Sequence, residues 1–121
     1  MSIERIYGAY MAYSEFVNYI EEILEPFGPI KIKRMFGGYG IYKAEIIFAI
    51  IVDNEIYFKA GLEVAEYFKS KGSEAFVYDA KGKTISMSYF KVPEEILEDK
   101  ELLTKWFDMS YNFVLQSKRG K

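Results

Sequence analysis

Three glycines, Gly37, Gly38 and Gly40, follow directly after a segment in which apolar and basic residues alternate. A residue without a side chain is favourable mainly where φ is positive or where another group approaches closely. The segment therefore predicts a tight turn or a bulge after a strand, which orients Phe36 and Tyr39. The candidate interaction motif consists of Arg34, Met35, Phe36, Gly37, Gly38, Tyr39 and Gly40.

The composition limits the class of protein. The chain has 121 residues, of which half are apolar and 18% are aromatic, as in globular proteins. A chain of this size buries roughly two-thirds of its unfolded surface, so we expect a single domain, residues 1–121, with one core. Cysteine and histidine are both absent. Disulfides, zinc sites built from these residues and histidine-dependent triads are excluded, and we expect no catalytic residue, metal or cofactor.

The charge balance bears on location and partners. Sixteen basic and eighteen acidic residues give a net charge of −2, which supplies no overall attraction to nucleic acid or to an anionic membrane. The longest apolar run, Ile46–Val52, is far shorter than the roughly 20 residues that span a bilayer, and the N-terminus lacks the layout of a signal peptide. We expect a cytoplasmic protein that does not associate with membranes.

The first regular element predicted is an amphipathic helix. From Ser14, a residue type that caps helix N-termini, apolar residues recur at helical spacing as far as Phe27. Pro26 and Gly28 should end this helix, because proline cannot continue the ladder of hydrogen bonds. Residues 1–13 carry apolar side chains at helical offsets and predict a helical extension.

Extended segments follow the helix. Ile32 and Phe36 alternate with lysines, which predicts a strand with one buried face and places Arg34 on that face. Asp53 and Asn54 suit a two-residue hairpin turn. The segments 30–36, 39–43, 46–52 and 55–59 together predict three antiparallel crossings. The segment 46–52, an unbroken apolar run, predicts a strand covered on both faces.

The second half of the chain predicts a helix, a hairpin and a further helix. Residues 62–68 favour a helix that ends at Gly72, and the segments 76–78 and 84–90 form a hairpin around Lys81-Gly82. In this hairpin Ile85, Met87 and Tyr89 are predicted to face inward.

The C-terminal region completes a single α+β domain. Pro93 suits the start of the last helical region, and residues 118–121 are expected to form a frayed basic tail. The predicted architecture is an antiparallel sheet with helices, in the order helix, three strands, helix, β-hairpin and C-terminal helix.

Five short stretches between Phe16 and Trp106 form a recognisable series. They are Arg34-Met35-Phe36-Gly37-Gly38 with Gly40, Phe48-Ala49, Tyr57-Phe58-Lys59, Met87-Ser88-Tyr89 and Val92-Pro93-Glu94-Glu95. In combination and in order, they resemble the N-terminal domain of the TfoX/Sxy regulators of bacterial natural competence. The resemblance implies an α+β fold similar to that of secretion chaperones, a cytoplasmic location and no catalysis. In the longer members it also implies a part in switching on DNA-uptake genes together with the cyclic-AMP receptor protein.

The chain departs from this family in two respects. Full-length regulators carry a second, C-terminal domain, which we do not expect in this chain. An acidic residue expected soon after Lys59 is replaced near Gly61. The first departure bears on whether the chain regulates competence at all, because a solitary N-terminal domain can be recruited to another role.

Arg34 is the sharpest candidate in the motif. Its predicted burial requires a carboxylate partner, because an unpaired buried guanidinium has a large desolvation cost. A structural ion pair, or a bulge that turns Arg34 back to water, is one interpretation, and an anchor for an acidic partner surface is the other. The glycines also admit a phosphate loop, but Ile41 and Tyr42 continue as strand, so no helix N-terminus faces an anion and a turn is favoured.

Two further patterns each have a structural and a functional interpretation. Lys31 and Lys33 share the outer strand face with aromatic residues, which can bind single-stranded nucleic acid or can simply protect a sheet edge. The rings of several residues can belong to the core or can form an aromatic patch for a partner or a second copy. These residues are Tyr57, Tyr78, Tyr89 and Trp106.

The leading hypothesis is a non-enzymatic protein-interaction module, related to the transcriptional control of DNA-uptake competence. Its partner is expected to be a protein, such as part of the transcription machinery, or a second copy in a homodimer. The alternatives are a nucleic-acid-binding module, and a small-molecule-binding protein or enzyme that uses Tyr, Lys, Arg or carboxylate side chains.

Overall fold

The computed structural model describes residues 14–35 and 37–119, with the side chains of residues 80, 85, 86 and 119 excepted. The predicted extension at residues 1–13 and the orientation of Phe36 lie outside this part of the chain. The helices are α2 (Glu15–Leu24), the 3-10 helix η1 (Glu25–Phe27), α3 (Leu62–Ser70), α4 (Glu94–Leu97) and α5 (Lys100–Arg119). The strands are β1 (Lys31–Met35), β2 (Gly38–Lys43), β3 (Ile46–Val52), β4 (Glu55–Lys59), β5 (Ala75–Ala80) and β6 (Lys83–Lys91).

The described strands form one antiparallel sheet of six in the order β1-β2-β3-β4-β6-β5. This confirms the predicted α+β class with an antiparallel sheet. The predicted count of three strands before the second helix is wrong, because four strands precede α3, one at each of the four extended segments that the sequence predicts. The predicted hairpin turns at Asp53-Asn54 and Lys81-Gly82 are confirmed, and all four residues have positive φ.

The first described helix, α2, begins where the sequence predicts but ends at Leu24, and the predicted helical segment continues to Phe27 as the 3-10 helix η1. Ser14 is its N-cap, and the Ser14 Oγ accepts a hydrogen bond from the backbone N–H of Val17 at 3.2 Å. Val17, Ile20 and Leu24 are buried, which gives the helix its apolar face. The chain leaves η1 at Gly28, where φ is 107°.

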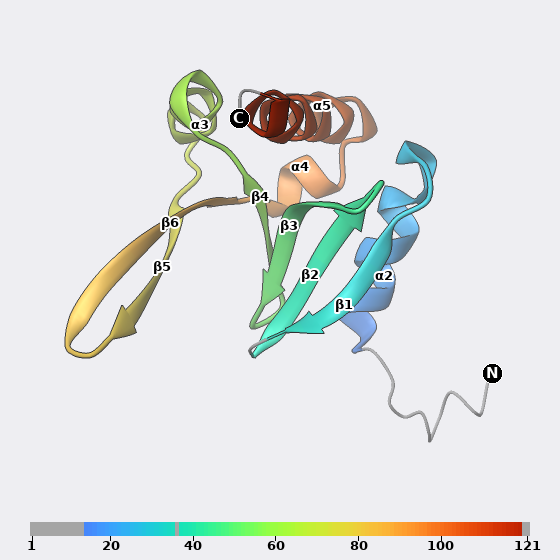
Figure 1. Cartoon of the computed structure of the whole chain (residues 1–121). Coiled ribbons are helices and arrows are strands. Elements are labelled where there is room, and N and C mark those ends of the chain that lie inside the picture. The colour runs from blue at the N-terminus through green and yellow to red at the C-terminus, as the bar shows by residue number, and fades with distance from the viewer. Residues whose placement is uncertain (1–13, 36, 120–121) are drawn as a thin grey trace.

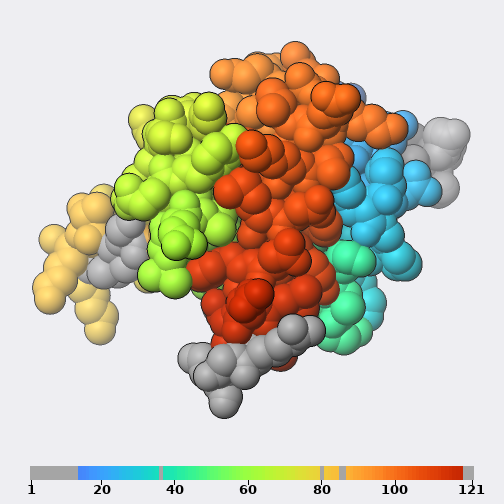
Figure 2. Space-filling view, turned by 90° about the horizontal axis from the view of Figure 1, so that it is seen from above, coloured from blue at the N-terminus to red at the C-terminus, as the bar shows by residue number. Residues whose placement is uncertain are grey.

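The helices lie on one side of the sheet (Figure 1). Seen from above, α3 and α5 lie side by side, and the β5–β6 hairpin projects beyond α3 (Figure 2). Phe107 of α5 meets Phe48 of β3 edge-on, with 5.1 Å between ring centroids, and Trp106 stacks on Phe68 of α3 at 4.1 Å. All four rings are buried. Aromatic packing therefore fixes α5 to both the sheet and α3.

Two hydroxyl groups of α5 also bind the backbone of the sheet. The Oγ of Ser110, which is fully buried, donates a hydrogen bond to the carbonyl oxygen of Lys59 at 2.7 Å. The hydroxyl of Tyr111 donates to the carbonyl oxygen of Lys43 at 2.9 Å. Because β4 ends at Lys59 and β2 ends at Lys43, α5 is anchored to the ends of two different strands.

The C-terminal helical region is divided into α4 and α5. The Oδ1 of Asp99 accepts hydrogen bonds from the backbone N–H groups of Glu101 and Leu102, each at 3.1 Å, and so starts a new helix. At the other end α5 continues through Arg119. The predicted frayed tail is therefore wrong for Lys118 and Arg119, while residues 120–121 lie outside the described part.

We predict that Phe48→Ala destabilises the protein by about 3–5 kcal/mol, because it leaves a cavity where three aromatic side chains meet the Phe48 ring. Leu62→Ala is the control, since Leu62 is 82% exposed and should change stability by less than about 0.5 kcal/mol. Urea unfolding followed by circular dichroism measures both. Similar losses for the two variants would contradict the assignment of the core.

Candidate functional site

The glycine motif forms the turn between β1 and β2. Met35 pairs with Gly38, so the chain turns back between these two residues, and Gly37 in this turn has a φ of 66°. This confirms the predicted tight turn. At Gly38, a Cβ atom would collide with the backbone carbonyl oxygen of Ile51 on β3. The lack of a side chain at Gly38 thus allows β2 and β3 to approach closely.

Gly40 leaves room for neighbouring side chains on the side of the sheet that faces away from the helices. A Cβ atom at Gly40 would lie 2.6 Å from the Sδ of Met35 and 3.0 Å from the Cδ1 of Ile47. The ring of Tyr42 would be 3.2 Å from it. These three side chains therefore gather over Gly40 and form an apolar surface there.

Arg34 lies at the end of β1, where the helices no longer cover the sheet. Its predicted burial is wrong, because the side chain is exposed and belongs to none of the ion pairs among the described residues. Its guanidinium carbon lies 5.4 Å from the centre of the Tyr39 ring. Ile32, two residues earlier on the same face, is buried. The alternation is thus correct, but the core ends between Ile32 and Arg34.

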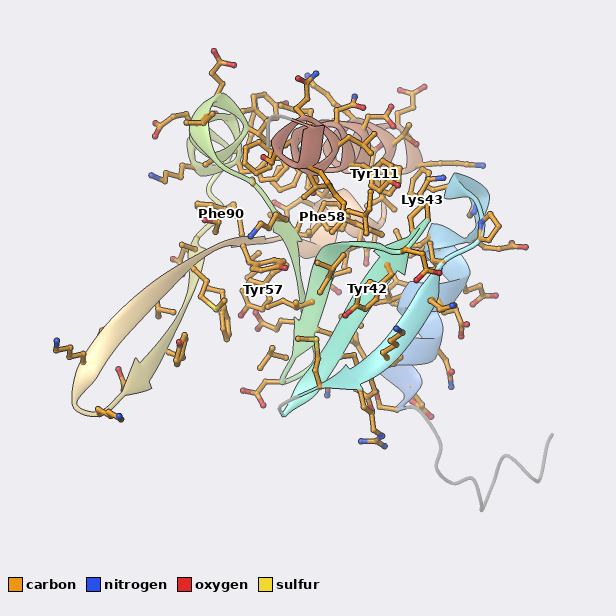
Figure 3. All side chains as sticks on the ribbon, viewed as in Figure 1. Tyr42, Lys43, Tyr57, Phe58, Phe90 and Tyr111 are labelled. Atoms are coloured by element: carbon orange, nitrogen blue, oxygen red, sulfur yellow. The ribbon has the colours of Figure 1, made fainter. Side chains whose placement is uncertain are left out.

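The side of the sheet away from the helices carries aromatic rings accompanied by lysines. We call this surface the platform, and it consists of Tyr42, Tyr57, Phe76 and Tyr89 with Lys33 and Lys59. Figure 3 shows Tyr42 and Tyr57 farther from α5 than Phe58 and Phe90, which lie toward the helices. No helix of the described part of the chain covers the platform.

The platform side chains contact one another across the sheet. The Lys33 Nζ lies 4.9 Å from the centre of the Tyr42 ring, and the Lys59 Nζ lies 4.9 Å from the centre of the Tyr89 ring. Tyr57 meets Phe76 of β5 edge-on, with 5.0 Å between centroids. These contacts join β1 to β2, and β4 to both β5 and β6.

The strand register places one residue from each of five neighbouring strands side by side, in a row that crosses the sheet. Neighbouring strands pair Lys33 with Gly40, Gly40 with Ile50, Ile50 with Tyr57 and Tyr57 with Lys91. Ile50 is only 7% exposed although no described helix covers its side of the sheet. The predicted covering of β3 on both faces is therefore correct only in part, because a layer of side chains, and no helix, shields the second face.

The lysines on this side of the sheet differ in their partners. The Lys91 Nζ lies 3.0 Å from the Glu55 carboxylate, and the Lys31 Nζ lies 3.5 Å from Glu45. The hydrogen bond with Glu55, followed by the negative charge of Glu55, raises the pKa of Lys91. Lys33 and Lys59 belong to no ion pair with another described residue. Their positive charges are therefore not neutralised by a described carboxylate.

Two platform tyrosines are shielded from water. Burial raises the pKa of Tyr89 above its ordinary value of 10.0, and the proximity of Tyr42 adds to this. Burial also raises the pKa of Tyr57, and the charge of Glu55 acts in the same direction. At neutral pH both hydroxyls are protonated and uncharged, so the platform carries cations and neutral rings.

A separate cleft of about 700 Å³ lies between α2, α4 and the ends of β4 and β6, and none of the glycine motif lines it. Phe16, Ile56 and Leu97 contribute apolar surface to it. Burial raises the pKa of Tyr19 in this cleft, and the negative charges of Glu98 and Glu94 add to the effect. Its charged lining residues are Glu55, Glu74, Glu94, Glu95, Glu98 and Lys91. This excess of carboxylates disfavours anionic ligands.

The sequence alone did not indicate Tyr42, Lys59 or Phe76 as site residues, although Lys59 stands in one of the stretches that carry the resemblance. The available signal was the alternation of side chains along β2 and β4, which places Tyr42 with Gly40 and Lys59 with Tyr57. The predicted inward orientation of Met87 is wrong, because Met87 is 38% exposed. Tyr89 is buried, but it lies in the platform on the side away from the helices, so its predicted inward orientation is also wrong. The side chain of residue 85 is outside the described part.

The described residues contain no group of three or more acidic side chains placed to hold a metal ion. None of their helices is both long enough and apolar enough to cross a membrane.

The comparison with protein families decides where the chain belongs. The TfoX N-terminal domain family matches residues 22–114. The chain belongs to this family. Three of the stretches that carried the resemblance supply the platform and its surroundings: Met35 to Gly40, Tyr57 to Lys59, and Met87 to Tyr89.

Curated relatives of this TfoX N-terminal domain are longer proteins. Protein Sxy of Escherichia coli is 24% identical over 98 residues, which cover 81% of this chain and 47% of that protein. DNA transformation protein TfoX1 of Aliivibrio fischeri is 29% identical over 79 residues, covering 65% and 36%. DNA transformation protein TfoX of Haemophilus influenzae is 28% identical over 93 residues, covering 75% and 43%. The chain thus matches less than half the length of each relative.

We predict that Gly38→Ala destabilises this TfoX N-terminal domain more than Gly37→Ala. The added methyl group at Gly38 meets a backbone oxygen that cannot move without separating β2 from β3, and such overpacking costs about 1–3 kcal/mol or more. Gly37 has no atom within 4 Å of the added group, so only its positive φ opposes alanine, at about 1–2 kcal/mol. Thermal denaturation of both variants measures the difference. The opposite order would contradict the strand-packing role of Gly38.

We also predict that the domain loses stability as the pH rises above about 10. A tyrosine whose pKa is raised in the folded state stays protonated there while the unfolded chain releases its proton, so alkali favours unfolding. Tyr89→Phe should make this loss of stability less steep, because the replacement ring does not titrate. Urea midpoints measured at neutral pH and at about pH 11 test this. An unchanged slope would show that Tyr89 does not contribute.

Proposed function

We propose that this TfoX N-terminal domain is a non-enzymatic protein-interaction module that takes part in the regulation of natural DNA uptake. It acts in the cytoplasm, and its partner is a protein connected with transcription. The platform and the neighbouring glycine hairpin form the interaction surface. The observation that carries the proposal is the aromatic side of the sheet, which no described helix covers, in a member of this family.

The comparisons support the link with DNA uptake. Two of the similar proteins are named DNA transformation proteins, and the third is protein Sxy. The matched part of each covers less than half of its length, so the role is carried to this chain as a proposal about the shared domain. Within a longer regulator, such a domain contributes contacts to other proteins.

The platform supports the interaction role. Tyrosine and methionine are enriched where proteins bind one another, because their side chains give a large contact area and adapt to a partner. Met35 and Met87 are each 38% exposed, and Tyr78 next to Phe76 is 44% exposed. Partly exposed apolar side chains that gather on one face of a folded domain are typical of a binding surface.

Nucleic-acid binding is the second candidate function. Lysines beside tyrosine rings are also the components of surfaces that bind single strands, with the amines near phosphates and the rings stacked on bases. The net charge of −2 opposes it. It is therefore kept as the alternative to protein binding.

The proposed role predicts a transformation phenotype. Deletion of the gene from its host should change the frequency of natural transformation at least about tenfold, with a matching change in transcripts of DNA-uptake genes. The wild-type gene should restore both, and a Tyr42→Ala, Tyr57→Ala double variant should not, although its circular dichroism spectrum is retained. Unchanged transformation and transcription after deletion would refute the regulatory role.

A further inference from the structure

We infer that the platform binds an extended, acidic segment of a partner protein, in which two carboxylates flank apolar residues. The inference rests on the proposed function, since it names the partner chemistry of the same surface. Three features of the structure lead to it: the charges of Lys33 and Lys59, the apolar surface between them, and the spacing that the strand register imposes.

The charges favour an acidic partner. Lys33 and Lys59 belong to no ion pair with a described carboxylate, whereas Lys31 and Lys91 on the same side of the sheet do. Each of the two amines lies over a tyrosine ring, at 4.9 Å from the ring centroid. A lysine resting on a ring keeps its remaining N–H groups available, so each can donate to a carboxylate.

The surface between the two lysines is apolar. Gly40 and Ile50 lie between Lys33 and Tyr57 in the transverse row, and the side chains of Met35 and Ile47 gather over Gly40. Apolar side chains of a bound segment can contact this area while carboxylates at its ends reach the amines. Met35 is partly exposed and adaptable, which suits it to such a contact.

The register sets the distance between the carboxylates. Lys33 lies on β1 and Lys59 lies on β4, which are three strand spacings apart, and Lys59 is two residues beyond the row that contains Lys33. With strands about 4.8 Å apart and about 3.4 Å per residue, their Cα atoms are roughly 16 Å apart. An extended segment covers this distance in about five residues, so the two carboxylates should be about five positions apart.

The same contacts favour an acidic segment over a nucleic acid. Base stacking needs a free aromatic face, but amines already lie over the rings of Tyr42 and Tyr89. Tyr57 is engaged edge-on by Phe76. A carboxylate can bind the amines without displacing them from the rings, whereas a stacked base cannot.

The test uses the full chain and a fluorescein-labelled synthetic peptide of about eight residues. Two glutamates, about five positions apart, enclose leucine and phenylalanine residues in this peptide. Fluorescence anisotropy measures its binding at low and at moderate salt. The comparison probes are the same peptide with glutamines in place of both glutamates, and a labelled oligothymidine of similar charge.

The variants are Lys33→Gln, Lys59→Gln and the control Lys105→Gln. Lys105 also lies over a tyrosine, 4.8 Å from the centroid of the Tyr67 ring, but this pair joins α5 to α3 on the helical side. We expect the acidic peptide to bind, with each platform variant weakening it about two- to fivefold and the double variant more, while the control leaves it unchanged. The glutamine peptide should bind more weakly, and added salt should weaken the acidic one.

Three outcomes would overturn the inference: no binding of the acidic peptide, binding that both platform variants leave unchanged, or preferential binding of oligothymidine that the same variants abolish. Circular dichroism melting of each variant checks that it is folded.

The transformation assay is independent of this experiment. If deletion alters transformation but the peptide does not bind, the regulatory role stands and the acidic partner is wrong. If the peptide binds and deletion has no effect, the binding surface stands and the regulatory role is wrong.

Discussion

The packing of α5 against the sheet determines what the other side of the sheet can do. Phe107 meets Phe48 of β3, and Trp106 stacks on Phe68 of α3, so a single helix joins the sheet to its helical cover. Together with α2 and α4, it buries one face in the core. With the described helices packed on that face, none of them covers the opposite face, which carries the platform.

A bulge in β3 changes which face of the sheet its side chains lie on. Ile41 pairs with Ala49 and Tyr42 pairs with Ile47, which leaves Phe48 as an extra residue on β3. Phe48 and Ala49 are both buried in the core, as expected where a bulge places neighbouring side chains on the same side. Beyond the bulge the alternation is reversed, so Ile50 faces the platform. The bulge thus adds the Phe48 ring to the core while Ile50 stays on the platform side of the sheet.

Local rules predicted much of the fold from the sequence. The Ser14 cap, the turn at Asp53-Asn54 and the glycine turn all depend on residues within a few positions of one another. The burial of Arg34 could not be predicted in this way. Alternation predicts on which face of the sheet a side chain lies. Only the packing of the helices determines how far along a strand that face is covered. The platform could not be predicted for a related reason. Its rings come from β2, β4, β5 and β6, and only the strand register brings them together.

The register also explains how separate stretches of the family pattern can serve one surface. Tyr57 and Lys59 flank Phe58, so in a strand the outer two face the platform while Phe58 enters the core. Met87 and Tyr89 also alternate on β6, the strand that pairs Lys59 with Tyr89, although Ser88 between them is exposed. Gly40 contributes by lacking a side chain, which allows Met35 and Tyr42 to approach each other. Alternation along β4 therefore lets one short stretch serve both faces of the sheet, since Phe58 packs in the core while Tyr57 and Lys59 face the platform.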